Sequence, residues 1–218
     1  MRKKKNSKHL SYYDLIEVFE KPGCPICRLT KKGIEDYYES LIYEYINDMG
    51  FRDTFRIDKG FCKYHAYKFL EYNDGLAVSL PYRDLLNDIL KDLKSVSKRN
   101  KKEKKVSPSS CMVCRMKKDI EKTYLSIIVD YIEDDEFVSK FVKSDGLCIP
   151  HYERLLSMMK HPPKWLVDFH MKKYREILKG LDRYIDSCNY SLGERRPKLT
   201  KKEKLVWKKV VEYIYGQK

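Results

Sequence analysis

Apolar side chains recur every three or four residues along most of the chain. Such stripes occupy six segments, at residues 12–19, 34–46, 80–96, 120–132, 163–186 and 200–214. This recurrence places the apolar side chains on one face of an α-helix, where they can meet a core. No segment shows the alternation of apolar and polar residues that is typical of a strand. The pattern therefore predicts an all-α protein.

The chain also contains an internal repeat. CPICR at residues 24–28 matches CMVCR at 111–115, and GFCKYH at 60–65 matches GLCIPH at 146–151. After one gap, identical residues recur 86 positions apart between these motifs, among them Ile34 and Ile120, Glu35 and Glu121, Tyr38 and Tyr124, and Phe55 and Phe141. So many identities in one alignment predict the tandem duplication of a single module.

We expect these modules to be separate domains. The first, with a basic N-terminal tail, covers residues 1–97, and the second covers residues 111–190. The basic linker at 98–110, KRNKKEKKVSPSS, has too few apolar residues to anchor it and is typical of an exposed connection. A basic C-terminal helix at 191–218 completes the predicted organisation, with Thr200 in a capping position.

The formal net charge of +14 is concentrated in three short segments. Residues 1–9, 98–105 and 194–209 carry +5, +5 and +6, which leaves the rest of the chain at −2. A basic groove within the folded body is therefore not indicated. The segments themselves suit a polyanion, so nucleic acid bound through the tails and the linker is the partner that charge predicts. In the alternative interpretation these lysines serve only solubility.

Six of the seven cysteines and two of the five histidines occupy matched positions of the repeat. They are Cys24, Cys27, Cys62 and His65 in the first module, and Cys111, Cys114, Cys148 and His151 in the second. Each module thus holds three thiols and one imidazole, which is a full tetrahedral ligand set for structural zinc. The sequence therefore predicts two zinc ions per chain, bound by these eight residues.

The two half-sites of a module are far apart in the sequence. A helix over residues 34–48 would carry the chain ~22 Å away from CxxC. The segment around Phe51 and Phe55 must then lead it back. We therefore expect each module to be a helical hairpin, clamped by its own CxxC and CxxH. The ligand set alone leaves open an exchange, in which the CxxC of one module pairs with the CxxH of the other.

Other uses of these residues are weaker explanations of the pattern. Three thiolates and one histidine can also hold an iron–sulfur cluster, which would make the chain a redox or electron-transfer protein. Disulfides give a repeated histidine no role, and a CxxC thiol catalyst leaves CxxH unexplained. If these cysteines and histidines only packed in a core without metal, their occurrence at eight matched positions of the repeat would be a coincidence. A zinc-binding adaptor is our main interpretation, and a protein–protein interaction scaffold is a further alternative.

Several classes of function have no support in the sequence. Four protein ligands leave a metal no open position, and no phosphate loop, nucleophile elbow or framed carboxylate pair is present, so neither an enzyme nor a small-molecule substrate is indicated. No apolar run reaches the ~18 residues of a membrane span. We expect a cytoplasmic protein. Cys188, His9, His161 and His170 lie outside both ligand sets and are expected to be ordinary residues.

The four motifs CPICR, GFCKYH, CMVCR and GLCIPH also resemble a known family. Its members are uncharacterised prokaryotic proteins of a little over two hundred residues, with paired CPxC and GLCxxH signatures and a domain of unknown function. The resemblance covers roughly residues 20–156. It implies a duplicated, helical, metal-binding protein with no established activity. Met112 and Lys63 depart from the commoner residues of the family, but neither is a predicted ligand.

Overall fold

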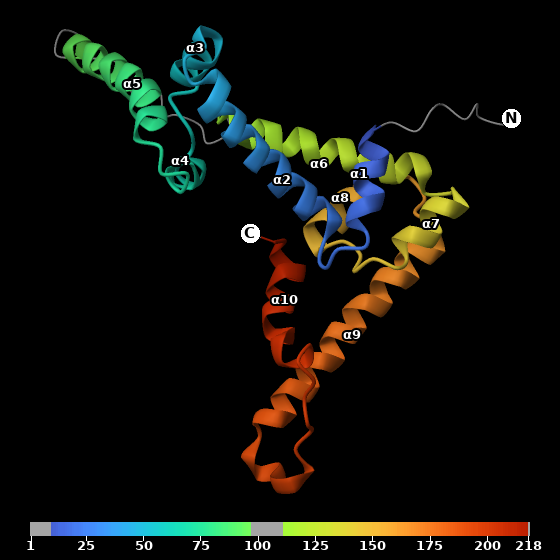
Figure 1. Ribbon diagram of the computed structural model, residues 1–218. Helices are drawn as coiled ribbons and strands as arrows, with labels where there is room; N and C mark the ends of the chain where they lie inside the picture. Colours follow the sequence, from blue (N-terminus) through green and yellow to red (C-terminus); the bar gives the residue numbers. More distant parts are fainter. Residues whose placement is uncertain (1–9, 97–110, 218) are drawn as a thin grey trace, which may run out of the picture. The chain divides into compact units, whose positions relative to one another are not determined.

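The computed structural model describes residues 10–96 and 111–217 (Figure 1). No strand occurs among these residues, so the all-α prediction is confirmed. The helices are α1 (Leu10–Val18), α2 (Pro25–Ser40), the π-helical η1 (Leu41–Tyr45), α3 (Met49–Ile57), α4 (Lys63–Leu70), α5 (Gly75–Val96), α6 (Met112–Tyr131), α7 (Asp135–Phe141), α8 (Ile149–Ser157), α9 (Lys164–Cys188), the 3₁₀ turns η3 (Tyr190–Arg195) and η4 (Glu203–Leu205), and α10 (Val206–Tyr215). The predicted N-terminal tail and basic linker lie outside the described residues. No helix within the described ranges is both long and apolar enough to cross a membrane.

The chain forms two compact units. The first unit comprises Met1–Lys31 and Glu121–Lys218, and the second comprises Lys32–Ile120. Both boundaries fall inside long helices, because α2 and α6 each continue from one unit into the other. The units are therefore not the two sequence modules, since each combines residues from both repeats.

The core of the first unit is built largely from aromatic rings. Phe19 follows α1 and meets Phe137 and Phe141 of α7 edge to face, with ring centroids 5.5 and 5.3 Å apart. Edge-to-face pairs add ~0.5–1.5 kcal/mol to the gain from burial. Tyr12 and Leu15 are fully buried beside them. The apolar stripe at residues 12–19 thus packs into the core, as its spacing predicts.

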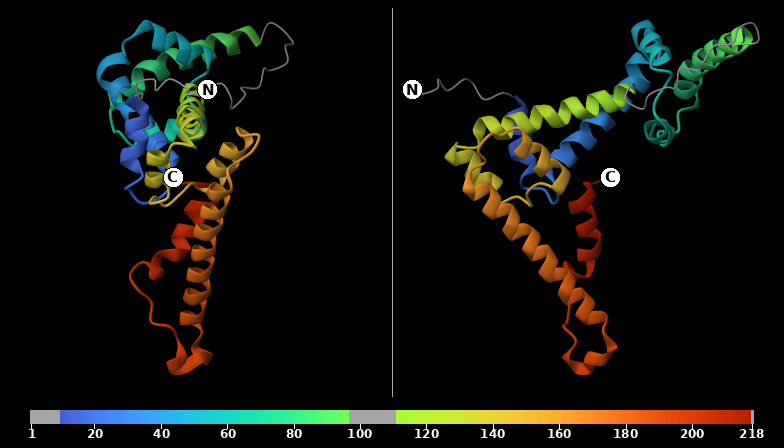
Figure 2. Two further views of the ribbon diagram at one scale, coloured as in Figure 1. Left: turned by 90° about the vertical axis from the view of Figure 1, so that its right-hand side faces the viewer. Right: turned by 180° about the vertical axis from the view of Figure 1, so that it is seen from behind.

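The C-terminal helix α10 packs beside α9 and also contacts α8 (Figure 2). Gly180 of α9 allows α10 to approach closely, because a Cβ atom at this position would lie 3.0 Å from the side chain of Val206, the first residue of α10. Tyr213 of α10 donates a hydrogen bond of 2.6 Å to the backbone oxygen of Asp145, and its ring meets Tyr174 edge to face. These contacts hold the last described residues, 216 and 217, near the N-terminus of α8.

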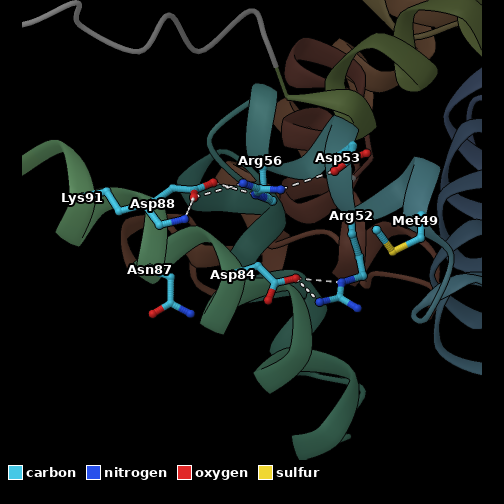
Figure 3. A pocket seen from close by; sticks show the side chains of 8 residues that line it. All are labelled: Met49, Arg52, Asp53, Arg56, Asp84, Asn87, Asp88 and Lys91. Carbon is cyan, nitrogen blue, oxygen red and sulfur yellow. Dashed lines mark hydrogen bonds and ion pairs between the residues drawn. The ribbon is translucent and has the colours of Figure 1, made fainter.

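The second unit has a core of its own around Tyr38, Phe55, Phe61 and Phe69. Helix α3 is joined to α5 by two ion pairs, Arg52 with Asp84 and Arg56 with Asp88. These four side chains line a shallow hollow of about 230 Å³ (Figure 3). Because its arginines are already paired with aspartates, the hollow has no concentrated charge to offer a ligand.

One predicted apolar stripe is not part of a core. Leu86, Ile89, Leu90 and Leu93 share a face of α5, as their spacing predicts, but they are 57, 43, 48 and 61% exposed. Helix α5 instead turns Leu85 inward and Asp84 and Asp88 toward α3. The pattern predicted the helix and the shared face correctly. The buried side of the helix, however, is a different one.

Candidate metal centres

The eight predicted ligands gather into two groups of four. The first cluster contains Cys24, Cys27, Cys148 and His151, and the second cluster contains Cys62, His65, Cys111 and Cys114. Within each cluster, one ligand atom from every residue lies within 4.8 Å of the others. Each group offers three sulfurs and one imidazole nitrogen, so each can hold a metal ion.

The half-sites are exchanged between the repeats. CxxC of the first repeat meets CxxH of the second, and CxxC of the second meets CxxH of the first. The expectation that each module is clamped by its own pair is therefore wrong, and the exchange that the ligand set had left open is what the structure shows.

Helix length gives the physical reason for the exchange. Helix α2 has 16 residues and carries the chain ~24 Å from CxxC, whereas α3 has nine residues and leads back ~14 Å at most. The η1 segment continues α2 directly, and the second repeat is similarly unequal, because α6 has 20 residues (~30 Å) and α7 has seven (~10 Å). In both repeats CxxH stays away from the CxxC of its own repeat, and in the second repeat it places His151 beside Glu121 in the middle of α6. It then meets the CxxC that belongs to the other repeat.

The first cluster is compact and fully buried. Nδ1 of His151 lies 3.1, 3.4 and 3.5 Å from the sulfurs of Cys148, Cys27 and Cys24. The sulfurs of Cys27 and Cys148 are 3.7 Å apart. All four residues are less than 9% exposed.

The second cluster has nearly the same dimensions. Nδ1 of His65 lies 3.2, 3.3 and 3.6 Å from the sulfurs of Cys62, Cys114 and Cys111, and the sulfurs of Cys62 and Cys114 are 3.6 Å apart. His65 and Cys111 are buried, but Cys62 and Cys114 are partly exposed. A disulfide would bring two sulfurs to ~2.05 Å, so all the cysteines in the described ranges are free thiols.

Both CxxH motifs enter their helices in the same way. Cys62 and Cys148 are the N-cap residues of α4 and α8, which places His65 and His151 in the first turn. A glycine two residues before each of these cysteines has a positive φ, +87° at residue 60 and +78° at residue 146, a conformation that side chains rarely adopt. Each glycine thus permits a sharp entry into the helix that carries the histidine. Pro25 begins α2 directly after Cys24, in the early helical position that suits proline.

A buried carboxylate supports the histidine of the first cluster. Oε1 of Glu121 lies 3.3 Å from Nε2 of His151, and Arg154 contacts the other carboxylate oxygen. Glu121 is only 3% exposed. Because Nδ1 faces the sulfurs, Nε2 carries a proton and donates a hydrogen bond to Glu121, as metal-binding histidines commonly do. The sequence did not predict a role for Glu121 at the metal site. The only signal there is that Glu121 matches Glu35 across the repeat.

The surroundings of the second cluster oppose the ionisation of all three thiols at once. Burial, followed by the neighbouring thiols, raises the pKa of Cys114 to about 12. Although burial opposes ionisation, hydrogen bonds from His65 and from backbone N–H groups lower the pKa of Cys111. One thiolate is therefore tolerated in this cluster, but three close together repel one another. A bound cation removes this repulsion and allows all three to ionise.

His170 is a structural histidine, as its lack of a ligand partner predicts. It is fully buried, its Nε2 accepts the backbone N–H of Leu147 at 3.1 Å, and its Nδ1 lies 2.9 Å from the oxygen of Leu166. Burial lowers its pKa to about 4, so the ring is neutral. His170 thereby holds the residue just before Cys148. Cys188 is exposed and belongs to neither cluster.

Two Cys3His clusters among the described helices define a candidate metal-binding protein. The chain belongs to the family of unknown function DUF6062, whose model matches residues 7–190. It is also similar to an uncharacterized 23.9 kDa protein in the xynA 3′ region of Caldicellulosiruptor sp. (strain Rt8B.4). The two are 25% identical over 205 residues, which cover 93% of this chain and 99% of that protein. No solved structure matches the chain.

Proposed function

We propose that each cluster binds one zinc ion and that the protein is a zinc-stabilised helical scaffold. The main support is the set of distances between the ligand atoms within each cluster. Zinc binds sulfur at ~2.3 Å and nitrogen at ~2.0–2.1 Å, so a tetrahedral site has S···S edges of ~3.8 Å and S···N edges of ~3.5 Å. One sulfur pair in each cluster is 3.7 or 3.6 Å apart, all ligand atoms of a cluster lie within 4.8 Å of one another, and the sulfur–nitrogen distances run from 3.1 to 3.6 Å. This geometry fits a single ion at the centre of each cluster.

The same distances disfavour an iron–sulfur cluster. Its protein ligands bind two or four different irons with bridging sulfides between them. Ligand atoms on different irons must then lie farther apart than ligands that share one ion. In each cluster all four ligand atoms lie within 4.8 Å of one another, which leaves no room for such an inorganic core. The redox function considered for these residues therefore has no geometric support.

Each ion would join parts of the chain that are distant in sequence. Cys27 and Cys148 are separated by 121 residues, and Cys62 and Cys114 by 52. With four protein ligands, neither ion has an open position for water or substrate. We therefore assign the ions a structural role and not a catalytic one.

Elemental analysis of protein purified without air tests this proposal. We expect two zinc ions per chain and a colourless solution, because zinc has no visible absorption with these ligands. Iron with a broad visible absorption, or protein without any bound metal, would contradict the assignment.

A second candidate function is the binding of single-stranded nucleic acid by the C-terminal segment of the first unit. Seven basic side chains there are exposed: Arg195, Arg196, Lys198, Lys201, Lys202, Lys204 and Lys208. Two exposed aromatic rings lie among them. Arg196 lies over Tyr190 at 5.1 Å, and Lys208 lies over Trp207 at 5.1 Å. Basic groups that bind phosphates, next to rings on which bases stack, are typical of such surfaces.

Charge reversal tests this second candidate. Replacing Arg195, Arg196 and Lys198 with glutamate is expected to weaken binding to a labelled oligothymidylate. It should also make the slope of log affinity against log salt shallower by about 2, because each lost phosphate contact removes about 0.7. The matched control reverses Lys160, Lys164 and Lys172, which are exposed elsewhere in the same unit. Equal losses in both variants, or binding that does not respond to salt, would reject the candidate.

A further inference from the structure

We propose that the two metal sites differ in permanence: the first cluster retains its zinc, whereas the second exchanges zinc with the surroundings and exposes reactive thiolates. This inference rests on the proposed zinc function and adds a division of roles between the sites. Ligand sets and dimensions are alike in the two clusters, so the difference must come from their surroundings.

The first difference is access to the sulfurs. Cys24, Cys27 and Cys148 are 4, 8 and 1% exposed. In the second cluster, Cys62 and Cys114 are both partly exposed. A chelator or an acceptor protein takes zinc by replacing one ligand at a time, so it needs a sulfur that solvent can reach. The second cluster offers two partly exposed cysteines, whose sulfurs are 3.6 Å apart.

The second difference is the support of the histidine. Nε2 of His151 has the buried carboxylate of Glu121 at 3.3 Å. Nε2 of His65 is also buried, but it has no hydrogen-bond partner among the described residues. A carboxylate partner fixes the orientation of a ligating ring and strengthens its donation to the metal, and its loss typically costs a factor of ~10–100 in metal affinity. The imidazole of the second cluster is thus the weaker ligand.

The repeat has the residues for the same support but does not use them. Glu35 and Lys68 match Glu121 and Arg154 at an offset of 86. Lys68 pairs with Glu71 instead, and the backbone oxygen of Glu35 accepts a hydrogen bond from Tyr72. Neither contact reaches His65. The asymmetry therefore comes from how the matched side chains are placed and not from their absence.

The third difference is a cover that the chain provides for the first cluster. The backbone N–H of Gln217 donates to the sulfur of Cys27 at 3.3 Å. Gly216 has φ of +85°, and a Cβ atom there would lie 3.3 Å from the sulfur of Cys27 and 3.7 Å from that of Cys148. The residues after α10 therefore lie directly against two sulfurs of this cluster, and they must move before a chelator can reach its ion.

Chelator kinetics on the full chain loaded with zinc test the proposal. With excess chelator and a colorimetric zinc indicator, we expect one ion per chain to leave at least ten times faster than the other. Pulses of N-ethylmaleimide followed by mass spectrometry identify the site. Cys62, Cys111 and Cys114 should become labelled with the fast phase, and Cys24, Cys27 and Cys148 with the slow one. Cys188 is exposed and reports immediate labelling.

A matched pair of variants tests the cause. Glu121→Gln keeps the shape of the carboxylate but removes its charge, and we expect it to speed the slow phase by ~10–100-fold. Glu35→Gln should change neither phase. If Glu121→Gln does not fold, the order of labelling in the unaltered chain still decides. Release of both ions in one phase, or labelling of the first cluster before the second, would overturn the proposal. Protein that carries no zinc at all would instead reject the zinc assignment itself.

Discussion

Complete removal of metal under reducing conditions is expected to unfold the chain. A structural zinc supplies ~10–16 kcal/mol of folding free energy in peptide systems, whereas a whole domain is stable by only ~5–15 kcal/mol. The free energy that the two ions would supply together is therefore larger than the stability of a typical domain. We expect the helical signal in far-UV circular dichroism to fall sharply after prolonged chelation, and to return when zinc is added back.

The structure gives two reasons for so large an effect. Each cluster joins segments that are distant in sequence, namely the start of α2 with α8, and α4 with the start of α6. In the second cluster without an ion, the pKa of Cys114 of about 12 would also leave this thiol protonated and uncharged at neutral pH. A chain that keeps its helical signal and melting temperature after both ions are lost would contradict a structural role for zinc.

The ligands are predictable from the sequence because they depend on local chemistry. CxxC and CxxH each place two donors within one helical turn, and this local geometry is the same in either pairing of half-sites. The all-α fold follows from the periodicity for the same reason. The repeat therefore indicates all eight residues that gather in the two clusters, although it does not indicate how they are divided between them.

The partners of these residues depend on distances that periodicity does not give. The hairpin prediction assumed that the segment around Phe51 leads the chain back to CxxC, but α3 is too short relative to α2. Glu121 and Gln217 reach the first cluster from α6 and from the end of the chain, and nothing in their local sequence indicates this. The exposed face of α5 could not be distinguished from a core face for the same reason, since spacing shows which residues share a face but not what covers it.

Pairs of ligand substitutions are expected to distinguish the exchanged arrangement from self-contained modules. In the structure Cys24 and Cys148 belong to one cluster, and Cys62 belongs to the other. The double variant Cys24→Ser with Cys148→Ser should therefore lose one zinc ion and keep one. The double variant Cys24→Ser with Cys62→Ser should lose both. Removing one of three thiolates is expected to empty a site, because a hydroxyl is a poor ligand for zinc and leaves the ion with only three strong donors.

The number of zinc ions per chain, measured after gel filtration, distinguishes the two arrangements directly. Cys188→Ser is the control and should keep two ions. Self-contained modules predict the reverse, with one ion retained in Cys24→Ser with Cys62→Ser and none in the other double variant. The single variant Cys24→Ser provides a second measurement if a double variant is insoluble. Its Cys148 should then react readily with maleimide while Cys62 reacts at the rate seen in the unaltered chain, because the site that has lost its ion spans both repeats. Faster labelling of Cys62 in that variant would show that the half-sites of one repeat bind the same ion.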